Sequence, residues 1–250
     1  MTNAIIEYSL IKDLHPEEFM FSALSKGTEG LKQSAWINSP NQEGGIVFQT
    51  FDPACGIGST TLRAPFPPNE PEGDAKKYSL SLYLDSGSET PIIEFLQTLD
   101  DKVINESMKR ATDYFKRPVS KNELLQMYMS AIKQPTRDGY PQMMRVRIGD
   151  ARQTKIYKTL VPLSECTSLG VVPYTDASVE DIIAHSRMHI AVKLGQLWFY
   201  QKRFGVTLNA NAILIDKTLD VFDARQDGFS FGKRKRNDNE KDNGTNTLMP

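Results

Sequence analysis

The sequence has few cysteines, little net charge and no long apolar segment, and each shortage excludes a class of protein. Its 250 residues include only Cys55 and Cys166, too few for a disulfide-stapled extracellular scaffold. No run of about 18 apolar residues occurs, which excludes a transmembrane helix. The opening MTNAIIEYSL has no basic segment followed by an apolar one, as a secretion signal would. We therefore expect an intracellular protein without a membrane partner.

The charges of the chain nearly cancel. The formal net charge is -1 and the sequence pI is about 6.3, so no global positive field favours nucleic acid and no acidic excess indicates a wholly disordered chain. Hydrophobic residues make up 39% of the chain, enough for an ordinary core. Any binding of charged partners must therefore depend on a local group of charges.

Complete motifs for catalysis and metal binding are also missing. The two cysteines form no C-x-x-C pattern. His185 and His189 have the spacing H-x-x-x-H but lack the glutamate of H-E-x-x-H, and residues 228–232 (GFSFG) match G-x-S-x-G only inside the polar tail, without the strand and helix that such a nucleophile needs. The segment CGIGSTTLR has glycines and hydroxyl groups, but no lysine follows Gly58, so a connecting loop is favoured over a phosphate site. We expect His189 on the solvent side of a strand. The sequence thus predicts no enzyme, no cofactor and no metal site.

Alternating apolar residues predict a series of short strands. In KKYSLSLYLD, Tyr78, Leu80, Leu82 and Leu84 alternate with polar neighbours, as in a half-buried strand. Similar runs predict strands at residues 46–51, 77–85, 143–148, 155–161, 187–200 and 206–215. A loop rich in proline and glycine separates the first two.

Two helices are expected between the early and the late strands. Apolar residues recur at helical spacing from Ile92 to Val103, which predicts a helix from Pro91 to about Lys116, and a capping-box pattern at Ser120 starts a second helix to about Lys133. A short helix is also expected at residues 16–23. The connections between the late strands are too short for crossover helices, which favours antiparallel pairing.

These elements predict a mainly β protein of the α+β class, an OB-like antiparallel barrel of roughly five or six strands with an inserted helical pair. We divide the chain into an N-terminal extension, a nucleic-acid-binding domain with its helical insertion at about residues 90–134, and a polar tail expected to be disordered. The three parts span residues 1–45, 46–219 and 220–250.

Basic residues on the predicted strands are the candidate binding residues. In MMRVRI, Met144, Val146 and Ile148 would share the core face, which leaves Arg145 and Arg147 together on the other. If the late strands are neighbours, their open faces would combine into a groove that follows a phosphate backbone. The cationic candidates are Arg145, Arg147, Lys155, Lys193, Lys202 and Arg203.

The segment QLWFYQKRFGVTL supplies flat rings beside these cations. Alternation places Trp198 and Tyr200 on one face and Phe199 on the other, and we expect Phe199 to pack in the core. Trp198 and Tyr200 are then the candidates for stacking on bases, with Tyr83 or Tyr157 as further candidates. The alternative is that the charges are only the solvated face of a sheet and the rings are mostly core.

The order of these parts, and the segments KKYSLSLYLD, VEDIIAHSRMHIAVKLGQLWFY and FGVTLNANAIL in particular, resembles the bacteriophage T7-type single-stranded-DNA-binding proteins. The likeness is closer to their relatives in nucleocytoplasmic large DNA viruses. It implies an OB fold with a helix between strands, sequence-tolerant binding of single-stranded DNA, and roles in DNA replication and recombination. It also implies homodimers, recruitment of a polymerase or helicase by an acidic C-terminal tail, and a viral protein in the host cytoplasm or nucleus.

The tail departs from that family pattern. Residues 233–236 read KRKR and precede only a few acids, so a self-inhibitory acidic tail is not expected. The basic run could instead be a nuclear-import signal, a DNA contact or a solvated segment.

Two hypotheses for the function of the protein result from the sequence. The first is a non-enzymatic single-stranded-DNA-binding protein, and the second is a viral structural or scaffolding protein that uses the β-domain for protein–protein contacts.

Overall fold

The computed structural model describes residues 9–25, 33–40, 45–50, 61–71, 77–84, 90–136, 138–163 and 172–217. All of them belong to residues 1–219, one of the two units into which the chain divides. The predicted tail, Cys55, Cys166 and most of the CGIGSTTLR segment lie outside the described residues.

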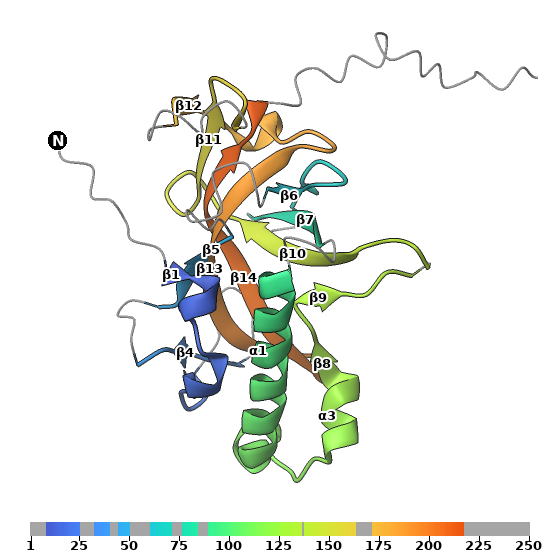
Figure 1. Cartoon of the computed structure of the whole chain (residues 1–250). Helices are drawn as coiled ribbons and strands as arrows, with labels where there is room; N and C mark the ends of the chain where they lie inside the picture. Colours follow the sequence, from blue (N-terminus) through green and yellow to red (C-terminus); the bar gives the residue numbers. More distant parts are fainter. Residues whose placement is uncertain are drawn as a thin grey trace, which may run out of the picture. The chain divides into compact units, whose positions relative to one another are not determined.

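Two long strands form the centre of the fold (Figure 1). They are β13 (Arg187–Tyr200) and β14 (Arg203–Ile215), which pair antiparallel with two register shifts, between Ala191 and Val192 and between Leu194 and Leu197. The turn between them is Gln201 and Lys202, both with positive φ (44° and 64°), the geometry of a two-residue turn that suits the twist of a hairpin. The predicted strands at residues 187–200 and 206–215 are therefore confirmed as the two arms of one hairpin.

Shorter strands pair along both edges of this hairpin. The path through the twelve-stranded sheet is β1-β5-β13-β14-β10-β7, with β3 and β6 on β13, β8 and β11 on β14, β9 on β10 and β12 on β11. Their bounds are β1 Ser9–Leu10, β3 Gln33–Ala35, β5 Val47–Gln49, β6 Leu62–Arg63, β7 Tyr78–Leu84, β8 Tyr128–Met129, β9 Ile132–Lys133, β10 Gln142–Ile148, β11 Lys155–Thr159 and β12 Tyr174–Asp176. A separate pair joins β2 (Met20–Phe21) to β4 (Ile37–Asn38).

The predicted class, mainly β with inserted helices, is confirmed, but the antiparallel barrel of five or six strands is wrong in three respects. Within the described ranges the sheet has twelve strands, and β8, β10 and β11 run parallel to β14. These parallel pairs are connected through other strands instead of a crossover helix. Between β11 and β14, for example, the chain passes through β12 and β13. Nor does the barrel close by a ladder among the described residues: on the β6 side, Asn69 makes one isolated bridge to Ser79 of β7.

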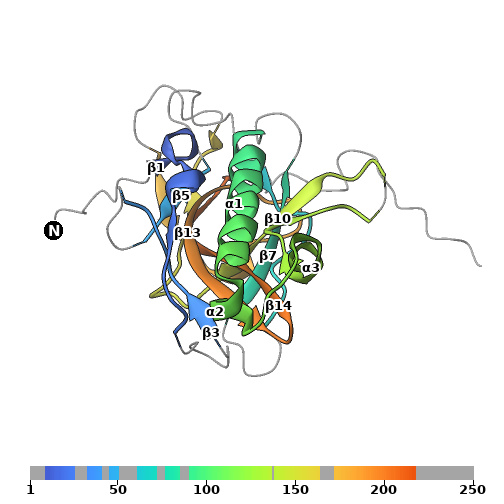
Figure 2. The same cartoon turned by 90° about the horizontal axis from the view of Figure 1, so that it is seen from below.

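Helices lie against one side of this sheet, and Figure 2 shows α1 across its concave side, between β5 and β13 on one flank and β7 and β10 on the other. The helices are α1 Thr90–Lys109, α2 Ala111–Phe115 and α3 Lys121–Met127, with one-turn 3-10 helices η1 Ile11–Asp13, η2 Pro16–Glu18 and η5 Val179–Asp181. The predicted apolar stripe of α1 is buried: Ile92, Phe95, Leu96, Leu99 and Val103 are at most 5% exposed. The ring of Phe95 meets that of Phe48 on β5 at 4.9 Å between centroids.

The N-terminal residues contribute to this core. Leu14, Phe19, Phe21, Ala35 and Ile37 are all buried in the same cluster as the strands and α1. In place of the helix predicted at residues 16–23, η2 is followed at once by β2. The backbone of Met20 and Phe21 pairs with β4, and this tertiary pairing prevails over the helical start signal at Pro16.

The second predicted helix starts as expected but ends early. The Ser120 hydroxyl accepts a hydrogen bond from the Glu123 N–H at 3.3 Å, which caps α3. The helix stops at Met127 rather than near Lys133, because β8 pairs with β14 at Phe204 and Gly205 and β9 pairs with β10. The segment after α3 is thereby attached to the tip of the central hairpin.

One half-buried carboxyl group joins this segment to α1. Tyr128 donates its hydroxyl to Asp100 Oδ1 at 2.5 Å, and the Ser130 hydroxyl donates to Asp100 Oδ2. Burial raises the pKa of Asp100 from its usual value of 3.8, and the two hydroxyl donors oppose this effect only in part. The hydrogen bonds at this carboxyl group therefore couple α1 to the segment that follows α3.

Replacing Asp100 with asparagine tests this coupling. Because folding raises the pKa of Asp100, the folded chain holds the proton more tightly than the unfolded chain does. The group therefore stabilises the fold fully below pH 3.8, the usual pKa of this group in the unfolded chain. This contribution is lost as the pH rises through the raised pKa of the folded chain. We expect the unfolding free energy of the wild type minus that of D100N to fall with rising pH, by about 1.4 kcal/mol for each unit by which the pKa is raised. Denaturant titrations at a series of pH values measure it, and a constant difference would contradict the account.

Candidate nucleic-acid interface

The outward side of β10 carries two arginines, as the sequence predicts. Met144, Val146 and Ile148 are at most 1% exposed, whereas Arg145 and Arg147 are exposed. On the neighbouring β7 their Cα partners are Ser81 and Ser79. Both arginines are exposed although β7 lies beside them.

Arg147 belongs to a row of polar side chains that crosses four strands. Its Cα partner on β14 is Asn209, and the partner of Asn209 on β13 is Lys193, which is exposed. Neighbouring strands lie about 4.8 Å apart, so the Cα atoms of Lys193 and Arg147 are roughly 10 Å apart. The order Lys193, Asn209, Arg147, Ser79 thus runs across the sheet. We call the outward side formed by Arg145, Arg147, Asn209 and Lys193 the basic face.

Lys155 continues this arrangement along β14. The chain leaves β10 through a tight loop, in which the Asp150 carboxylate accepts hydrogen bonds from the N–H groups of Arg152 and Gln153 at 3.0 and 3.2 Å. It then returns to the same edge of β14 as β11, where Lys155 pairs with Ala212 and is exposed. Arg145, Arg147 and Lys155 therefore follow one another along a single edge of β14.

Several strands of the sheet carry basic residues without acidic ones, whereas α1 carries both. The described strands β6, β7, β10, β13 and β14 contain no aspartate or glutamate, and all their lysines and arginines are exposed: Arg63, Arg145, Arg147, Arg187, Lys193 and Arg203. On α1, by contrast, Glu106 accepts a hydrogen bond from Lys109 at 2.8 Å, which lowers its pKa. The strand cations thus create positive potential without carboxylates in the same strands.

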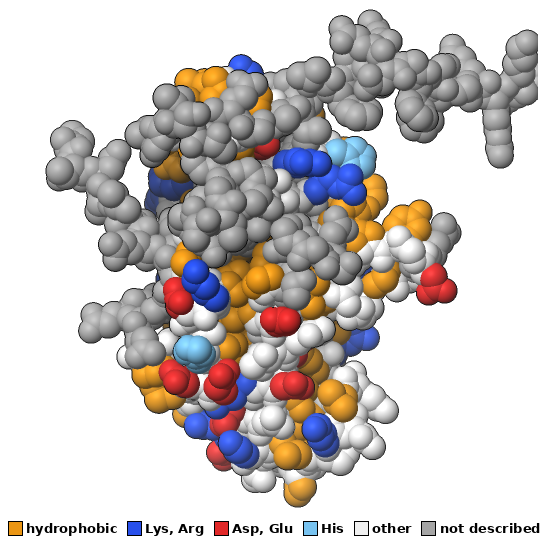
Figure 3. Space-filling model, viewed as in Figure 1, with side chains coloured by type: hydrophobic (Ala, Val, Ile, Leu, Met, Phe, Trp, Pro, Cys, Tyr) orange, Lys and Arg blue, Asp and Glu red, His pale blue; other side chains and the backbone are white. Residues whose placement is uncertain are grey.

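A second group of cations lies where β6 joins β13, and the sequence interpretation did not include it among the binding residues. Arg63 and Arg187 are Cα partners on these strands, and the Arg63 guanidinium lies 5.1 Å from the centre of the Tyr83 ring on β7. Figure 3 shows lysine and arginine side chains beside a histidine near β6, whereas both signs of charge are mixed over α1. Arg63 was missed because a two-residue strand inside a proline-rich segment has no periodicity.

The aromatic residues of the hairpin face the directions that alternation predicts. Phe199 is 8% exposed and stacks on Phe204 with 5.7 Å between ring centroids, so its predicted burial is confirmed. Tyr200 is 44% exposed and Trp198 is half-buried. The indole of Trp198 lies over Gly205, where an added Cβ would approach Trp198 Cζ2 to 3.1 Å. The register shift between Leu194 and Leu197 reverses the alternation along β13, so Trp198 lies on the same outward side as Lys193.

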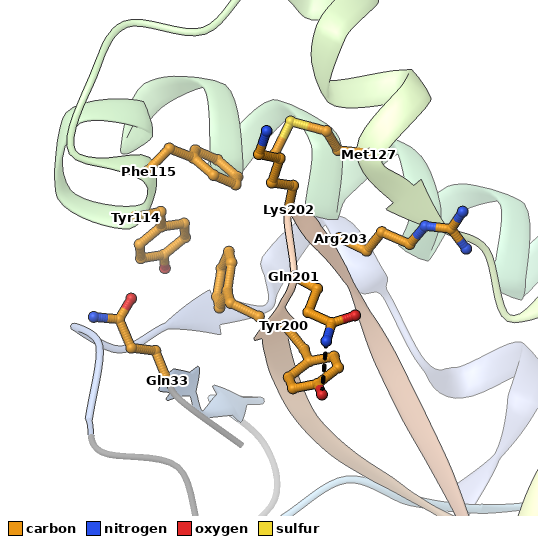
Figure 4. A pocket seen from close by; sticks show the side chains of 9 residues that line it. Gln33, Tyr114, Phe115, Met127, Tyr200, Gln201, Lys202 and Arg203 are labelled. Carbon is orange, nitrogen blue, oxygen red and sulfur yellow. Dashed lines mark hydrogen bonds between the residues drawn. The ribbon is translucent and has the colours of Figure 1, made fainter. Parts of the chain in front are cut away.

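The remaining candidates lie at the tip of the hairpin. Lys202 is in the turn, and Arg203 directs its guanidinium to Met129, with 3.7 Å between Nη1 and Sδ. Figure 4 shows Arg203 pointing away from Lys202 and Tyr200. The eight predicted residues do not form one cluster. Arg145, Arg147, Lys155, Lys193 and Trp198 lie on the outward side along the sheet; Tyr200 follows Trp198 on that side at the hairpin tip, where Lys202 and Arg203 point in different directions.

The sequence also led to expectations about His189, metal ligands and membrane spans, and the described residues bear on each of them. His189 is 8% exposed, so its predicted position on the solvent side is wrong; its side of β13 is covered at this point, as the 6% exposure of Ala191 also shows. Within the described ranges no three of the histidine, cysteine, aspartate and glutamate side chains gather as metal ligands. None of the described helices has both the length and the apolar composition of a membrane span.

Comparison with known proteins gives similarity at the level of structure alone. No protein-family model matches the chain, and no curated protein matches it. Among solved structures, it is similar to gp2.5 of bacteriophage T7, with a TM-score of 0.43, 9% identity and 68% of this chain covering 91% of that one. It is also similar to the single-stranded-DNA-binding protein of bacteriophage Enc34, with a TM-score of 0.39 and 12% identity; the match covers 78% of this chain and 89% of that one.

A further similar structure is the Enc34 protein in complex with single-stranded DNA, with a TM-score of 0.38, 12% identity and 78% of this chain covering 94% of that one. All three are structures of phage single-stranded-DNA-binding proteins. At these identities and TM-scores they do not establish the family of this chain. The predicted closeness to proteins of large DNA viruses stays a prediction.

The contact of Trp198 with Gly205 gives a test of the geometry at the hairpin. In G205A, the new methyl carbon would lie 2.6 Å from the carbonyl oxygen of Met129 and 3.1 Å from Trp198, so β8 or the indole must move. We expect a loss of about 1–3 kcal/mol in unfolding free energy. In a W36F background Trp198 is the sole tryptophan, and its emission should shift. Unchanged stability and emission would contradict the described packing.

Proposed function

We propose that this protein binds single-stranded DNA without sequence specificity and performs no catalysis. The observation that carries the proposal is the segregation of charge: the central strands expose cations on the basic face and contain no acidic residue. In this proposal Arg145, Arg147, Lys155 and Lys193 neutralise phosphates. Each contact releases counterions, which supplies affinity that does not depend on base sequence.

Rings beside the cations favour a single strand over a duplex. Trp198 lies on the outward side of β13 and Tyr83 on that of β7, at either flank of the basic face, and Tyr200 is exposed beyond Trp198. The bases of a single strand are free to stack on such rings, at about 1–3 kcal/mol per base, whereas those of a duplex are already stacked on one another. Asn209 adds a neutral hydrogen-bonding group between the cations. Lys202 and Arg203 would contact phosphates that pass the hairpin tip.

The biological role that we propose is support of viral DNA replication and recombination, in an intracellular setting. Contacts with a replicative polymerase or helicase, and a homodimer, belong to the same proposal. These finer statements are supported by the resemblance of the sequence segments around residues 77–85, 179–200 and 204–214. The basic face supports only the binding of a polyanion that offers free bases.

Replacing Arg145 and Arg147 together with alanine tests the proposed phosphate contacts. Both side chains are exposed on β10, so folding should be retained. We expect the affinity for oligo-dT to fall by about tenfold or more, since a hydrogen bond to a charged group contributes about 1.5–3 kcal/mol. The slope of log affinity against log salt should also decrease by about 0.7 for each phosphate contact that is lost. Fluorescence anisotropy at a series of salt concentrations measures both.

The matched control is the double variant K109A/K121A, which removes two exposed cations from α1 and α3. It changes the net charge by the same amount and should leave the salt slope unchanged. Equal losses in the two double variants would indicate a general charge effect and contradict the proposed site. If the wild-type chain has no affinity for oligo-dT, the protein–protein assembly hypothesis replaces this one.

A further inference from the structure

A recess opens at the tip of the central hairpin, away from the basic face. Its volume is about 310 Å³, at the lower end of the range of small-ligand pockets. It is formed by the hairpin turn, the short helix α2, the end of α3 and the start of β3 (Figure 4). The residues that line it are Gln33, Tyr114, Phe115, Met127, Phe199, Tyr200, Gln201, Lys202 and Arg203.

Interlocked rings make the apolar wall of this recess rigid. Phe199 meets Tyr114 at 5.1 Å and Phe115 at 5.6 Å between centroids, and Phe115 also meets Phe204 at 5.4 Å. The Tyr114 hydroxyl donates to the carbonyl oxygen of Ser22 at 3.1 Å, so its polar end is already bonded. The wall therefore presents ring and thioether surface, which suits a flat, apolar occupant.

The rim of the recess is polar and positively charged. None of the described residues that line it is acidic, and Lys202 in the turn extends to the side where Phe115 and Met127 lie (Figure 4). The Gln201 amide donates to the Tyr200 hydroxyl at 3.0 Å on another side. The Gln33 amide, on β3, can both donate and accept a hydrogen bond. A flat group attached to an anion matches this combination of wall and rim.

We propose that the recess binds a single nucleobase of the bound DNA strand, with Lys202 contacting the adjoining phosphate. The inference rests on the proposed function. Trp198 and Tyr200 project from the outward side of β13 between Lys193 and the turn, so a strand that leaves the basic face along β13 reaches the tip. Phe115 and Phe199 then contact the base, and Gln33 is placed to bond its polar edge.

The methionines of the full-length chain report on the recess directly. Met127 lines it, whereas Met144 and Met188 are fully buried at 0% exposure and serve as internal references. With 13C-labelled methionine methyl groups, NMR titration with oligo-dT should shift the Met127 signal through the ring current of the bound base and leave both references in place. An oligonucleotide with abasic sites throughout should bind the basic face without that shift.

A variant of the turn separates the phosphate contact from the fold. Lys202 has φ of 64°, a conformation that asparagine tolerates, so K202N removes the charge and preserves the turn. We expect K202N to weaken oligo-dT binding by roughly threefold to tenfold, as loss of one phosphate contact requires, and to reduce the Met127 shift at equal DNA concentration. The control K121N, at an exposed lysine of α3, should match the wild type.

The outcomes distinguish this inference from the proposed function. If oligo-dT binds and the R145A/R147A variant loses affinity for it, but the Met127 methyl signal does not shift, then the recess does not bind a base and the proposed function stands. An equal shift with the abasic strand would overturn the base as the occupant. If an acidic peptide with one phenylalanine shifts Met127 and oligo-dT does not, the recess is a peptide site. If oligo-dT does not bind at all, both proposals fail.

Discussion

The pairing of β13 with β14 is the interaction on which the rest of the structure depends. The two strands have 14 and 13 residues, longer than any single neighbour, so their outer edges are filled by several short strands in succession. The same pairing places Asn209 between Lys193 and Arg147, and it places Phe199 on Phe204 beneath the recess. The turn of Gln201 and Lys202 sets the register beside it, from Tyr200–Arg203 to Leu197–Val206, and two register shifts farther along the hairpin keep its apolar residues on the core side.

The second constraint is electrostatic. A chain with a net charge of -1 has no global attraction for DNA, so local segregation has to supply it. Acidic residues such as Glu106 lie on α1 among their own basic partners, and the central strands expose arginine and lysine without carboxylates. The helices also complete the core under the sheet, where Phe95 meets Phe48. On the side of the sheet turned away from α1, Arg145, Arg147 and Lys193 are exposed and Trp198 is half-buried, although His189 and Ala191 are covered there.

Period-two alternation predicted the long strands and the directions of Arg145, Arg147 and Phe199, because alternate residues of a strand face opposite sides whatever its neighbours are. It could not predict which strands are neighbours, so the row of Lys193, Asn209 and Arg147 and the parallel pairs on β14 emerged only from the structure. Strands of two residues, such as β6 and β8, have no period and depend on pairing alone. His189 shows the same limit: alternation gave its side of β13, but neighbouring parts of the chain decide that this side is covered there.

The most direct test of the basic face is to find which residues touch a bound strand. Oligo-dT containing 5-bromodeoxyuridine can be crosslinked to the full-length protein by ultraviolet light, and the modified peptides identified by mass spectrometry. The account predicts crosslinks in β10 and β13, with Trp198 among the modified residues. Crosslinks confined to α1 and α3, which lie against the concave side of the sheet, would contradict it.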